Sequence, residues 1–396
     1  MTDEKNAGIM SYGLFAMVVT HALVHAAGAM RNSILPLVKD EFFLTNTQVG
    51  LIAAVPPLAQ ALLSIPAGYW SDRYGAKKLV ALSIGMAVVG AILGGVTWSP
   101  WIFIVATTLL TLNSTFYHPP SHSYVARLVR RVDRSKALGF LNAGGTFGIA
   151  VGPLSITLVI EWLGFSWREL YLFWVIPISL GFVILYFVRE IRREDSVSGK
   201  EIEGDATTLW TRGFMVYLTS RGIRMFAMGM MSAFIAIYLT EVRGWSIGQV
   251  GIMYGASSLL GIFASPVGGE IASHVGNKKW AVISLGVGYA FLLGAFFTRG
   301  IYPFMAMYLS YRFFGILAMP AMASITAALT PPKQMGMGYA LSFMPASIAG
   351  VVAAPIAGYI ADFYGYLPIF MVSVVILYLG LAVLQVGVKL KPMGQS

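Results

Sequence analysis

The side chains with the most chemical potential in this sequence are arginines and histidines inside long apolar stretches. The arginines are Arg31, Arg221, Arg224 and Arg312, and the histidines are His21, His25, His118 and His122. A charge at the centre of a bilayer costs roughly 2.5–3.5 kcal/mol even on lenient insertion scales, so each buried arginine needs a reason to be there. These residues mark the candidate functional site.

No acidic residue is placed to neutralise those arginines. The acids nearest to the apolar stretches lie at their ends, and they are Asp40, Glu41, Glu161, Glu241 and Glu270. A guanidinium binds phosphate, phosphonate or carboxylate groups through paired hydrogen bonds. We therefore predict an anionic substrate at Arg224 and Arg312, with Arg31 as a further contact. The alternative is a structural role, in which backbone carbonyls and tyrosine hydroxyls hold the arginines.

The spacing of polar residues places several of them on shared helical faces. An i, i+4, i+7, i+11 pattern is formed by His21, His25, Gly28 and Asn32. Asn113 and Tyr117 are one helical turn apart, as are Tyr308 and Arg312. The predicted substrate-binding set is therefore Arg224, Arg312, Arg31, His25, Asn113, Tyr117, His118 and Tyr308.

The histidines suit proton coupling, because histidine titrates near physiological pH. We predict that His21, His25 or His118 binds the coupling proton, and the alternative is a structural hydrogen bond. His21 and His25 also have zinc-like spacing, but Ala22 replaces the glutamate of H-E-x-x-H and the sequence offers no evident third ligand. The sequence contains no cysteine, which excludes disulfides and thiolate metal sites. No metal site and no cofactor is predicted.

The composition is that of a membrane protein. The 396 residues are 57% hydrophobic and 11% charged, whereas soluble domains carry roughly 25% charged residues. The net charge of +10 could suggest nucleic-acid binding, but the topology below explains it better. We expect a lipid bilayer and no nucleic acid as partners.

Twelve apolar stretches are long enough to cross a hydrocarbon core of roughly 30 Å. They lie near 11–37, 47–70, 78–97, 101–127, 137–160, 167–188, 213–240, 246–271, 279–298, 301–328, 337–360 and 366–388. The predicted fold is an all-α polytopic membrane protein of twelve transmembrane helices. Residues 1–190 and 213–396 form six-helix halves, and the charged segment 191–212 is a cytoplasmic linker.

Positive charges predict the orientation. With both termini inside the cell, 19 of the 27 lysines and arginines lie in cytoplasmic segments. The outside keeps four of them, Lys39, Arg168, Arg243 and Arg299. The positive-inside rule favours this topology, so we predict a multi-pass protein of the cytoplasmic membrane with both termini cytoplasmic.

The two halves repeat. The loop after the second stretch, from Gly68 to Lys78, matches the loop after the eighth, from Gly269 to Lys279, at an offset of 201 residues. Three further matches, at offsets of 199 to 201, are Pro66 with Pro266, Pro120 with Pro320, and Gly139 with Gly338. Several matches near one offset indicate a duplication, which is common in transporters.

These motifs resemble those of the major facilitator superfamily. Its G-x-x-x-D-R-x-G-x-K-K signature is similar to the first loop, in which the matching residues are Gly68, Asp72, Arg73, Gly75, Lys77 and Lys78. In the second loop, Ser273 and His274 replace the acid and base. The fifth stretch carries Gly148-x-x-x-Gly152-Pro153, which resembles the helix-five antiporter motif without its closing glycine pair. The stretch Phe116-Tyr117-His118-Pro119 is similar to the fosmidomycin-resistance branch.

The resemblance implies two pseudo-symmetric six-helix bundles around a central cavity lined by helices one, four, seven and ten. It implies that Asp72 and Arg73, with Gly68 and Gly75, latch the halves in one of the alternating states. Conformational gating is also implied for Gly148, Gly152 and Pro153.

The sequence therefore predicts a secondary active transporter, working as a monomer, that moves a small organic anion by alternating access. Proton-coupled export is favoured by the helix-five motif. Proton-coupled or exchange-driven uptake of an organic phosphate or carboxylate is the alternative, and a non-transporting membrane sensor is a more remote one. An enzyme is not predicted, because no nucleophile–base pair or metal constellation is evident.

Overall fold

The computed structural model describes residues 11–130, 133–190, 209–331 and 334–390. The linker predicted at 191–212 therefore lies almost wholly outside the described residues. The helices, including two π-helices named η3 and η5, are α1 Tyr12–Ala29, α2 Arg31–Glu41, α3 Asn46–Tyr74, α4 Ala76–Gly95, α5 Pro100–Leu128, α6 Arg134–Ile156, η3 Thr157–Trp162, α7 Trp167–Tyr186, α8 Arg212–Ser232, α9 Ile235–Ile237, η5 Tyr238–Val242, α10 Ile247–Val275, α11 Asn277–Phe297, α12 Ile301–Leu317, α13 Met319–Leu329, α14 Met335–Tyr364 and α15 Tyr366–Gly387.

These helices confirm the all-α polytopic fold. Eleven helical stretches within the described ranges are long and apolar enough to cross a membrane. The remaining predicted span is α5, which is 29 residues long but carries Asn113, His118 and His122 among its apolar residues. Four predicted spans are divided locally, for example the first at Met30 and the tenth at Ala318.

The connection after the second span is shorter than the sequence predicted. The sequence predicts a connection between the spans 47–70 and 78–97 that contains the polar segment Ser71–Gly75, but α3 continues through Tyr74 and α4 begins at Ala76. Gly75 alone breaks the helix. Its φ is +90°, a backbone conformation that residues with a Cβ rarely adopt. Gly276, with φ +95°, makes the equivalent break between α10 and α11. One glycine therefore replaces each predicted loop.

The chain forms two compact units. Unit 1 comprises the described parts of Met1–Phe43, Val55–Gly199 and Ser246–Ser258. Unit 2 comprises those of Leu44–Ala54, Lys200–Trp245 and Leu259–Ser396. The first turns of α3 therefore belong to unit 2 and the rest of α3 belongs to unit 1. The first turns of α10 belong to unit 1 and the rest of α10 belongs to unit 2.

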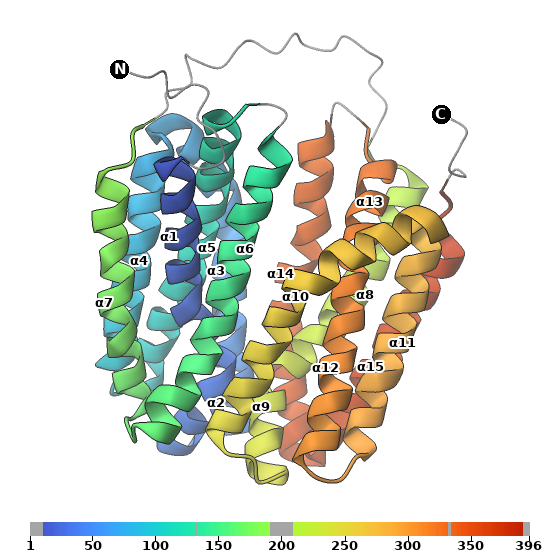
Figure 1. The fold of residues 1–396 in the computed structure, drawn as a ribbon. Coiled ribbons are helices and arrows are strands. Elements are labelled where there is room, and N and C mark those ends of the chain that lie inside the picture. The colour runs from blue at the N-terminus through green and yellow to red at the C-terminus, as the bar shows by residue number, and fades with distance from the viewer. Residues whose placement is uncertain (1–10, 131–132, 191–208, 332–333, 391–396) are drawn as a thin grey trace. The chain divides into compact units, whose positions relative to one another are not determined.

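The helices pack in the same pattern within each unit (Figure 1). In unit 1, α1 contacts α5, α6 and α7, and α4 contacts α5 and α7. In unit 2, α8 contacts α13, α14 and α15, and α11 contacts α12 and α15. The matching pattern agrees with the predicted pseudo-symmetry.

Side-chain hydrogen bonds repeat as well. In each unit, a serine on the third span donates to a carbonyl of the fourth, and a lysine at the start of the third span donates to a carbonyl at the end of the sixth. These bonds are Ser83 Oγ to Asn113 O (2.8 Å), Ser284 Oγ to Phe314 O (2.7 Å), Lys77 Nζ to Tyr186 O (2.9 Å) and Lys278 Nζ to Gln385 O (2.6 Å). The duplicated residues therefore hold the helices of each unit together.

A carboxylate caps a helix N-terminus in each unit. Within unit 1, Glu161 accepts a hydrogen bond from the backbone N–H of Gly248 at the start of α10 (2.9 Å). Within unit 2, Asp362 accepts bonds from the backbone N–H groups of Asn46 (2.9 Å) and Thr47 (2.8 Å) at the start of α3. These carboxylates satisfy N–H groups that a helix leaves unpaired, and they lie at the positive end of its dipole.

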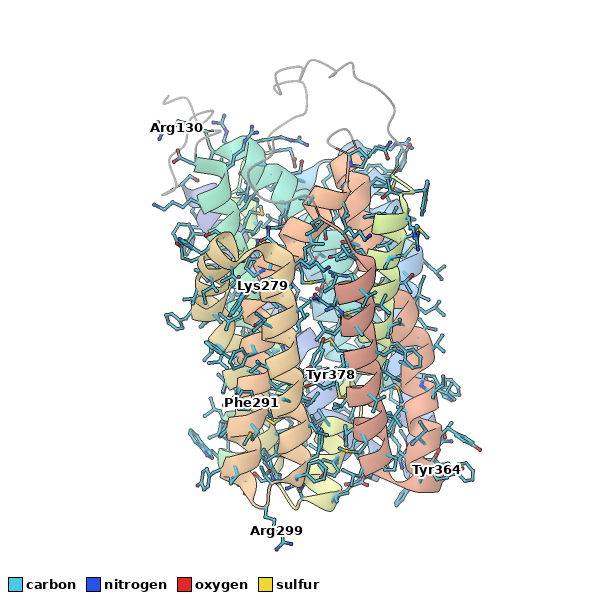
Figure 2. The ribbon with its side chains drawn as sticks, turned by 90° about the vertical axis from the view of Figure 1, so that its right-hand side faces the viewer. Arg130, Lys279, Phe291, Arg299, Tyr364 and Tyr378 are labelled. Atoms are coloured by element: carbon cyan, nitrogen blue, oxygen red, sulfur yellow. The ribbon has the colours of Figure 1, made fainter. Side chains whose placement is uncertain are left out.

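In unit 2, labelled charged residues lie at the two ends and labelled aromatic residues lie between them (Figure 2). Lys279 lies at one end of α11, Arg299 lies beyond the other, and Phe291 and Tyr378 lie between them. The 21 residues of α11 give a length of about 31 Å at 1.5 Å per residue, which matches the hydrocarbon thickness of roughly 30 Å.

Candidate substrate and coupling site

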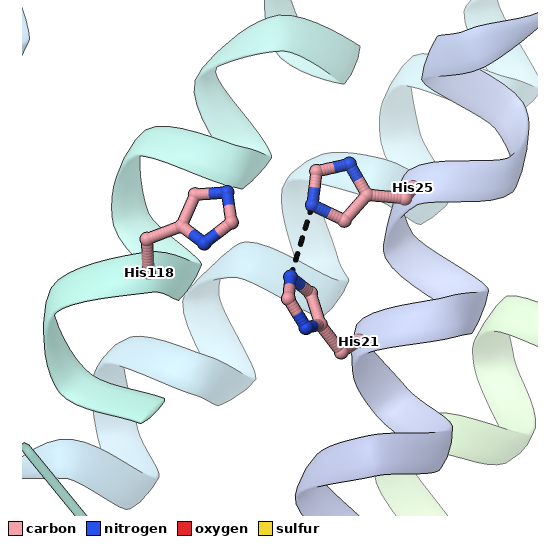
Figure 3. A group of neighbouring side chains, drawn as sticks. All are labelled: His21, His25 and His118. Atoms are coloured by element: carbon pink, nitrogen blue, oxygen red, sulfur yellow. Dashed lines mark hydrogen bonds between the residues drawn. The ribbon is translucent and has the colours of Figure 1, made fainter. Parts of the chain in front are cut away.

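Three histidines come together in unit 1 (Figure 3). His21 and His25 lie on successive turns of α1, and His118 lies on α5. The Nε2 atoms of His21 and His25 are 3.1 Å apart and share a hydrogen bond. The ring centroid of His118 lies 5.1 Å from that of His21 and 5.2 Å from that of His25. The sequence predicted each of these residues as functional, and the fold places them in one cluster.

Tyr117 positions this cluster. Its ring stacks on the His21 ring, with centroids 4.8 Å apart and an angle of 14° between the planes. Its hydroxyl donates to the Met17 carbonyl and is 2.8 Å from the Thr20 hydroxyl. The Tyr117 side chain is fully buried and ties α5 to α1, and its predicted contact with a substrate stays a prediction.

Asn113 has a similar position one turn earlier on α5. Its side-chain amide donates to the Val24 carbonyl of α1 at 3.1 Å, and the residue is fully buried. Its Oδ1 accepts no hydrogen bond within the described residues. Asn113 therefore helps to fix α1 against α5, and its predicted contact with a substrate stays a prediction.

The glycines of the helix-five motif bring α6 close to α1. A Cβ built on Gly148 would lie 2.1 Å from the Ala22 carbonyl oxygen, and one on Gly152 would lie 2.1 Å from the Ala26 carbonyl oxygen. Small residues allow membrane helices to approach in this way. Pro153 follows within the same helix. The predicted gating role of this motif stays a prediction, and close packing is the role that the coordinates display.

Arg31 begins α2, directly after the break at Met30. Its Nε donates to Asn32 Oδ1 at 3.2 Å, and its guanidinium interacts electrostatically with the Tyr171 hydroxyl. That hydroxyl is buried and has no hydrogen-bond partner in the described ranges. The predicted contact of Arg31 with a substrate stays a prediction.

Arg224 is the most enclosed arginine of unit 2. It lies on α8 with 5% of its surface exposed, and its guanidinium interacts electrostatically with the Tyr289 hydroxyl of α11. The Arg224 Nε has no partner among the residues that the structure describes. Gly380 on α15 makes room for the side chain, because a Cβ there would lie 2.6 Å from Arg224 Cγ.

Arg312 lies on α12 among tyrosines. It interacts electrostatically with Tyr311 and Tyr308. The ring centroids of these two tyrosines are 5.7 Å apart. Tyr311 also interacts electrostatically with Tyr289. We refer to Arg224, Tyr289, Tyr311 and Arg312 as the arginine–tyrosine cluster.

Sequence reasoning missed Tyr289 and Tyr311. Tyr311 directly precedes Arg312, but helical spacing turns adjacent residues to different faces and favoured Tyr308 instead. Tyr289 lies in an apolar span without other polar signals, so only the packing of α11 against α12 reveals it.

The N-terminus of α4, which lies in the signature segment after the second span, is capped by a carboxylate from beyond α7. Glu190 accepts hydrogen bonds from the backbone N–H groups of Ala76 and Lys77, each at 3.0 Å. Arg73 lies over the Tyr74 ring at 5.5 Å. Gly68 and Asp72 belong to α3, but the side-chain placement of Asp72 is not described, so the predicted latch stays a prediction.

Comparisons with known sequences agree with this architecture. A family model described as Major Facilitator Superfamily matches residues 17–316 and, in a second match, residues 217–394. The chain is 27% identical to the fosmidomycin resistance protein of Escherichia coli, over 89% of this chain and 87% of that protein. It is 22% identical to a probable sulfoacetate transporter, SauU, of Cupriavidus necator, over 87% and 86% of the two chains. It is 26% identical to the multidrug resistance protein MdtG of Salmonella arizonae, over 70% of each.

A solved structure shares the fold. A bacterial homologue of the human lysosomal transporter Spinster, crystallised in an inward-facing and unoccupied conformation, superposes with a TM-score of 0.77. The match covers 97% of this chain and 98% of that one, at 17% identity. At that identity, the likeness establishes the architecture alone.

Proposed function

The chain belongs to the Major Facilitator Superfamily and is a multi-pass secondary transporter rather than an enzyme, and we propose that it carries a small organic anion. The observation that carries this proposal is the arginine–tyrosine cluster. It lies within one unit and comprises two arginines and two tyrosines, on helices α8, α11 and α12, whose sequences contain no Asp or Glu.

The sequence itself makes this cluster short of negative charge. There is no Asp or Glu between Asp205 and Glu241, or between Glu270 and Asp362. Neither α8, α11 nor α12 can therefore supply a carboxylate to Arg224 or Arg312. Tyrosine hydroxyls solvate a guanidinium but do not neutralise it, so an anion that enters with the substrate gains a strong charge-assisted interaction.

The names of two groups of relatives support this reading in part. The probable sulfoacetate transporter is named for an anion, which favours an anionic substrate here. Resistance proteins are named for protection against a compound, which favours export. We therefore propose export through the cytoplasmic membrane by alternating access, with both termini cytoplasmic.

We propose that a proton gradient drives this export, since the helix-five motif of α6 resembles that of antiporters. The prediction that His21, His25 or His118 binds the coupling proton is kept with this proposal. The other predicted substrate contacts stay predictions, and they are Arg31, His25, Asn113, Tyr117, His118 and Tyr308.

The test is equilibrium binding to the purified full-length protein. The probes are phosphorylated, phosphonate, sulfonate, carboxylate and cationic compounds, and the variants are Arg224→Ala and Arg312→Ala. Loss of a charge-assisted hydrogen bond worth about 1.5–3 kcal/mol weakens affinity roughly 10–150-fold. Arg299→Ala is the matched control, because Arg299 is exposed at the end of unit 2.

Anions that bind wild type and Arg299→Ala but not the two cluster variants would support the proposal. Selective binding of cations, unchanged by all three substitutions, would overturn it. Flux in proteoliposomes then distinguishes export from uptake. Proton-driven export predicts that an imposed proton gradient drives the anion against the flow of protons, whereas proton-coupled uptake predicts that the anion moves with the protons.

A further inference from the structure

His21, His25 and His118 offer three nitrogen donors to one point (Figure 3). One ring nitrogen from each lies within 4.8 Å of the other two. The closest pair, His21 Nε2 and His25 Nε2, is 3.1 Å apart. His21 is 2% exposed, and His25 and His118 are half-buried.

We propose that these three histidines form a binding site for a borderline transition-metal dication such as Zn²⁺ or Co²⁺. Nitrogens bound to one tetrahedral Zn²⁺ at about 2.0–2.1 Å lie about 3.3 Å from each other. The closest pair nearly has this spacing. Closing the widest separation, 4.8 Å, takes a movement of about 1.5 Å, which rotation of an imidazole about its side-chain bonds supplies.

The surroundings prepare His21 to be a ligand. Its Nδ1–H donates to the Leu141 carbonyl of α6 at 2.7 Å, which leaves Nε2 with a free lone pair. A backbone carbonyl on the second nitrogen is the usual way in which proteins orient a metal-binding histidine. The His21 Nε2 therefore accepts a hydrogen bond from His25 Nε2–H. When a metal binds, His25 moves its proton to Nδ1 and turns its own Nε2 lone pair to the ion, so no proton is released.

The donor set selects the class of ion. The sequence has no Asp or Glu between Glu4 and Asp40, or between Asp72 and Asp133, and no cysteine anywhere. Neither α1 nor α5 can therefore add a carboxylate or thiolate. Imidazole alone suits zinc, cobalt, nickel and copper, whereas magnesium and calcium prefer oxygen ligands. Three neutral ligands leave a fourth position for water or an added anion.

The test is a Co²⁺ titration of the full-length protein after removal of any polyhistidine tag. The sequence has five histidines in total, so the background is small. One tetrahedral Co²⁺ per chain is expected, with strong visible absorption that Zn²⁺ displaces. Removing a second-shell partner commonly costs 10–100-fold in metal affinity, so loss of a ligand in His118→Asn is expected to cost at least about 100-fold.

The double variant His122→Asn/His274→Asn is the matched control. The His122 ring nitrogens face the His118 carbonyl (2.8 Å) and Asn142 Oδ1 (3.2 Å) rather than the cluster, and His274 is exposed on α10. This control should bind Co²⁺ as wild type does. An octahedral spectrum in wild type, or equal loss of binding in the control and in His118→Asn, would refute the site.

A measurement on wild type alone covers the case in which His118→Asn does not fold. X-ray absorption of the Zn²⁺-loaded protein should show three imidazole nitrogens at about 2.0 Å. Oxygen-only coordination would mean that the histidines form a hydrogen-bonded cluster and no metal site. The proposal does not depend on the anion, so either outcome leaves the test of the arginine–tyrosine cluster intact.

Discussion

The substitution Gly148→Ala tests whether the helix-five motif acts through close packing. An ideal Cβ on Gly148 would lie 2.1 Å from the carbonyl oxygen of Ala22 and 2.8 Å from its carbonyl carbon. Both atoms belong to the backbone of α1 and cannot rotate away. Since carbon–oxygen contacts need about 3.3 Å, α1 and α6 must separate by roughly 1 Å.

Overpacking of this kind costs about 1–3 kcal/mol. At about 2–4 °C per kcal/mol for a domain of this size, the expected fall in Tm is about 2–12 °C. The measurement is thermal unfolding of the purified protein in detergent, followed by intrinsic fluorescence.

Gly139→Ala on the same helix is the control. A Cβ there meets no atom within 4 Å, so the greater helix propensity of alanine should stabilise the protein by up to about 1 kcal/mol. Equal melting of the two variants would refute the packing argument. A Gly148→Ala variant that melts normally but no longer transports would show that the glycine serves motion, as the family motif implies.

Three further predictions concern side chains that form hydrogen bonds between helices. Lys77→Ala should lower stability more than Lys278→Ala, because Lys77 Nζ donates to two carbonyls, at 2.9 and 2.6 Å; equal Tm values would contradict this. Asp362→Ala should cost about 1 kcal/mol by removing the cap on α3, measured as a shift in Tm, and a gain in stability would refute the cap. Tyr117→Phe should cost about 1 kcal/mol yet leave Co²⁺ affinity unchanged, because the ring that stacks on His21 remains; a large loss of Co²⁺ binding would show that the hydroxyl, and not the ring, positions the cluster.

The spans were predictable because membrane helices are fixed by length and apolar content. Predicted and observed ends mostly agree within a few residues, as for 366–388 and α15, Tyr366–Gly387. The error at Ser71–Gly75 has a physical cause. Polar residues in that segment suggest a loop, but a helix that leaves the bilayer can continue into water until a residue such as Gly75 breaks it.

The site was predictable in its residue types but not in its contacts. Burying arginine or histidine in lipid is costly, so Arg224, Arg312 and the three clustered histidines stand out in the sequence. The meeting of His118 with His21 depends on the packing of α5 against α1, which local spacing does not encode. For that reason no third ligand was evident from the sequence, and no metal site was predicted.

Comparison of the two duplicated halves distinguishes residues that hold the fold together from the candidate site residues. In spans four and ten, the carbonyls of Asn113 and Phe314 accept equivalent serine hydrogen bonds at an offset of 201 residues. At the same offset, Arg312 corresponds to Thr111 and His118 to Met319. The bonds that hold helices together recur because both units must pack alike. The cationic and imidazole side chains do not recur, so packing that both units need cannot explain their presence. Each unit therefore offers different ligand chemistry. Unit 2 has an arginine–tyrosine cluster suited to an anion, and unit 1 has three nitrogen donors suited to a cation.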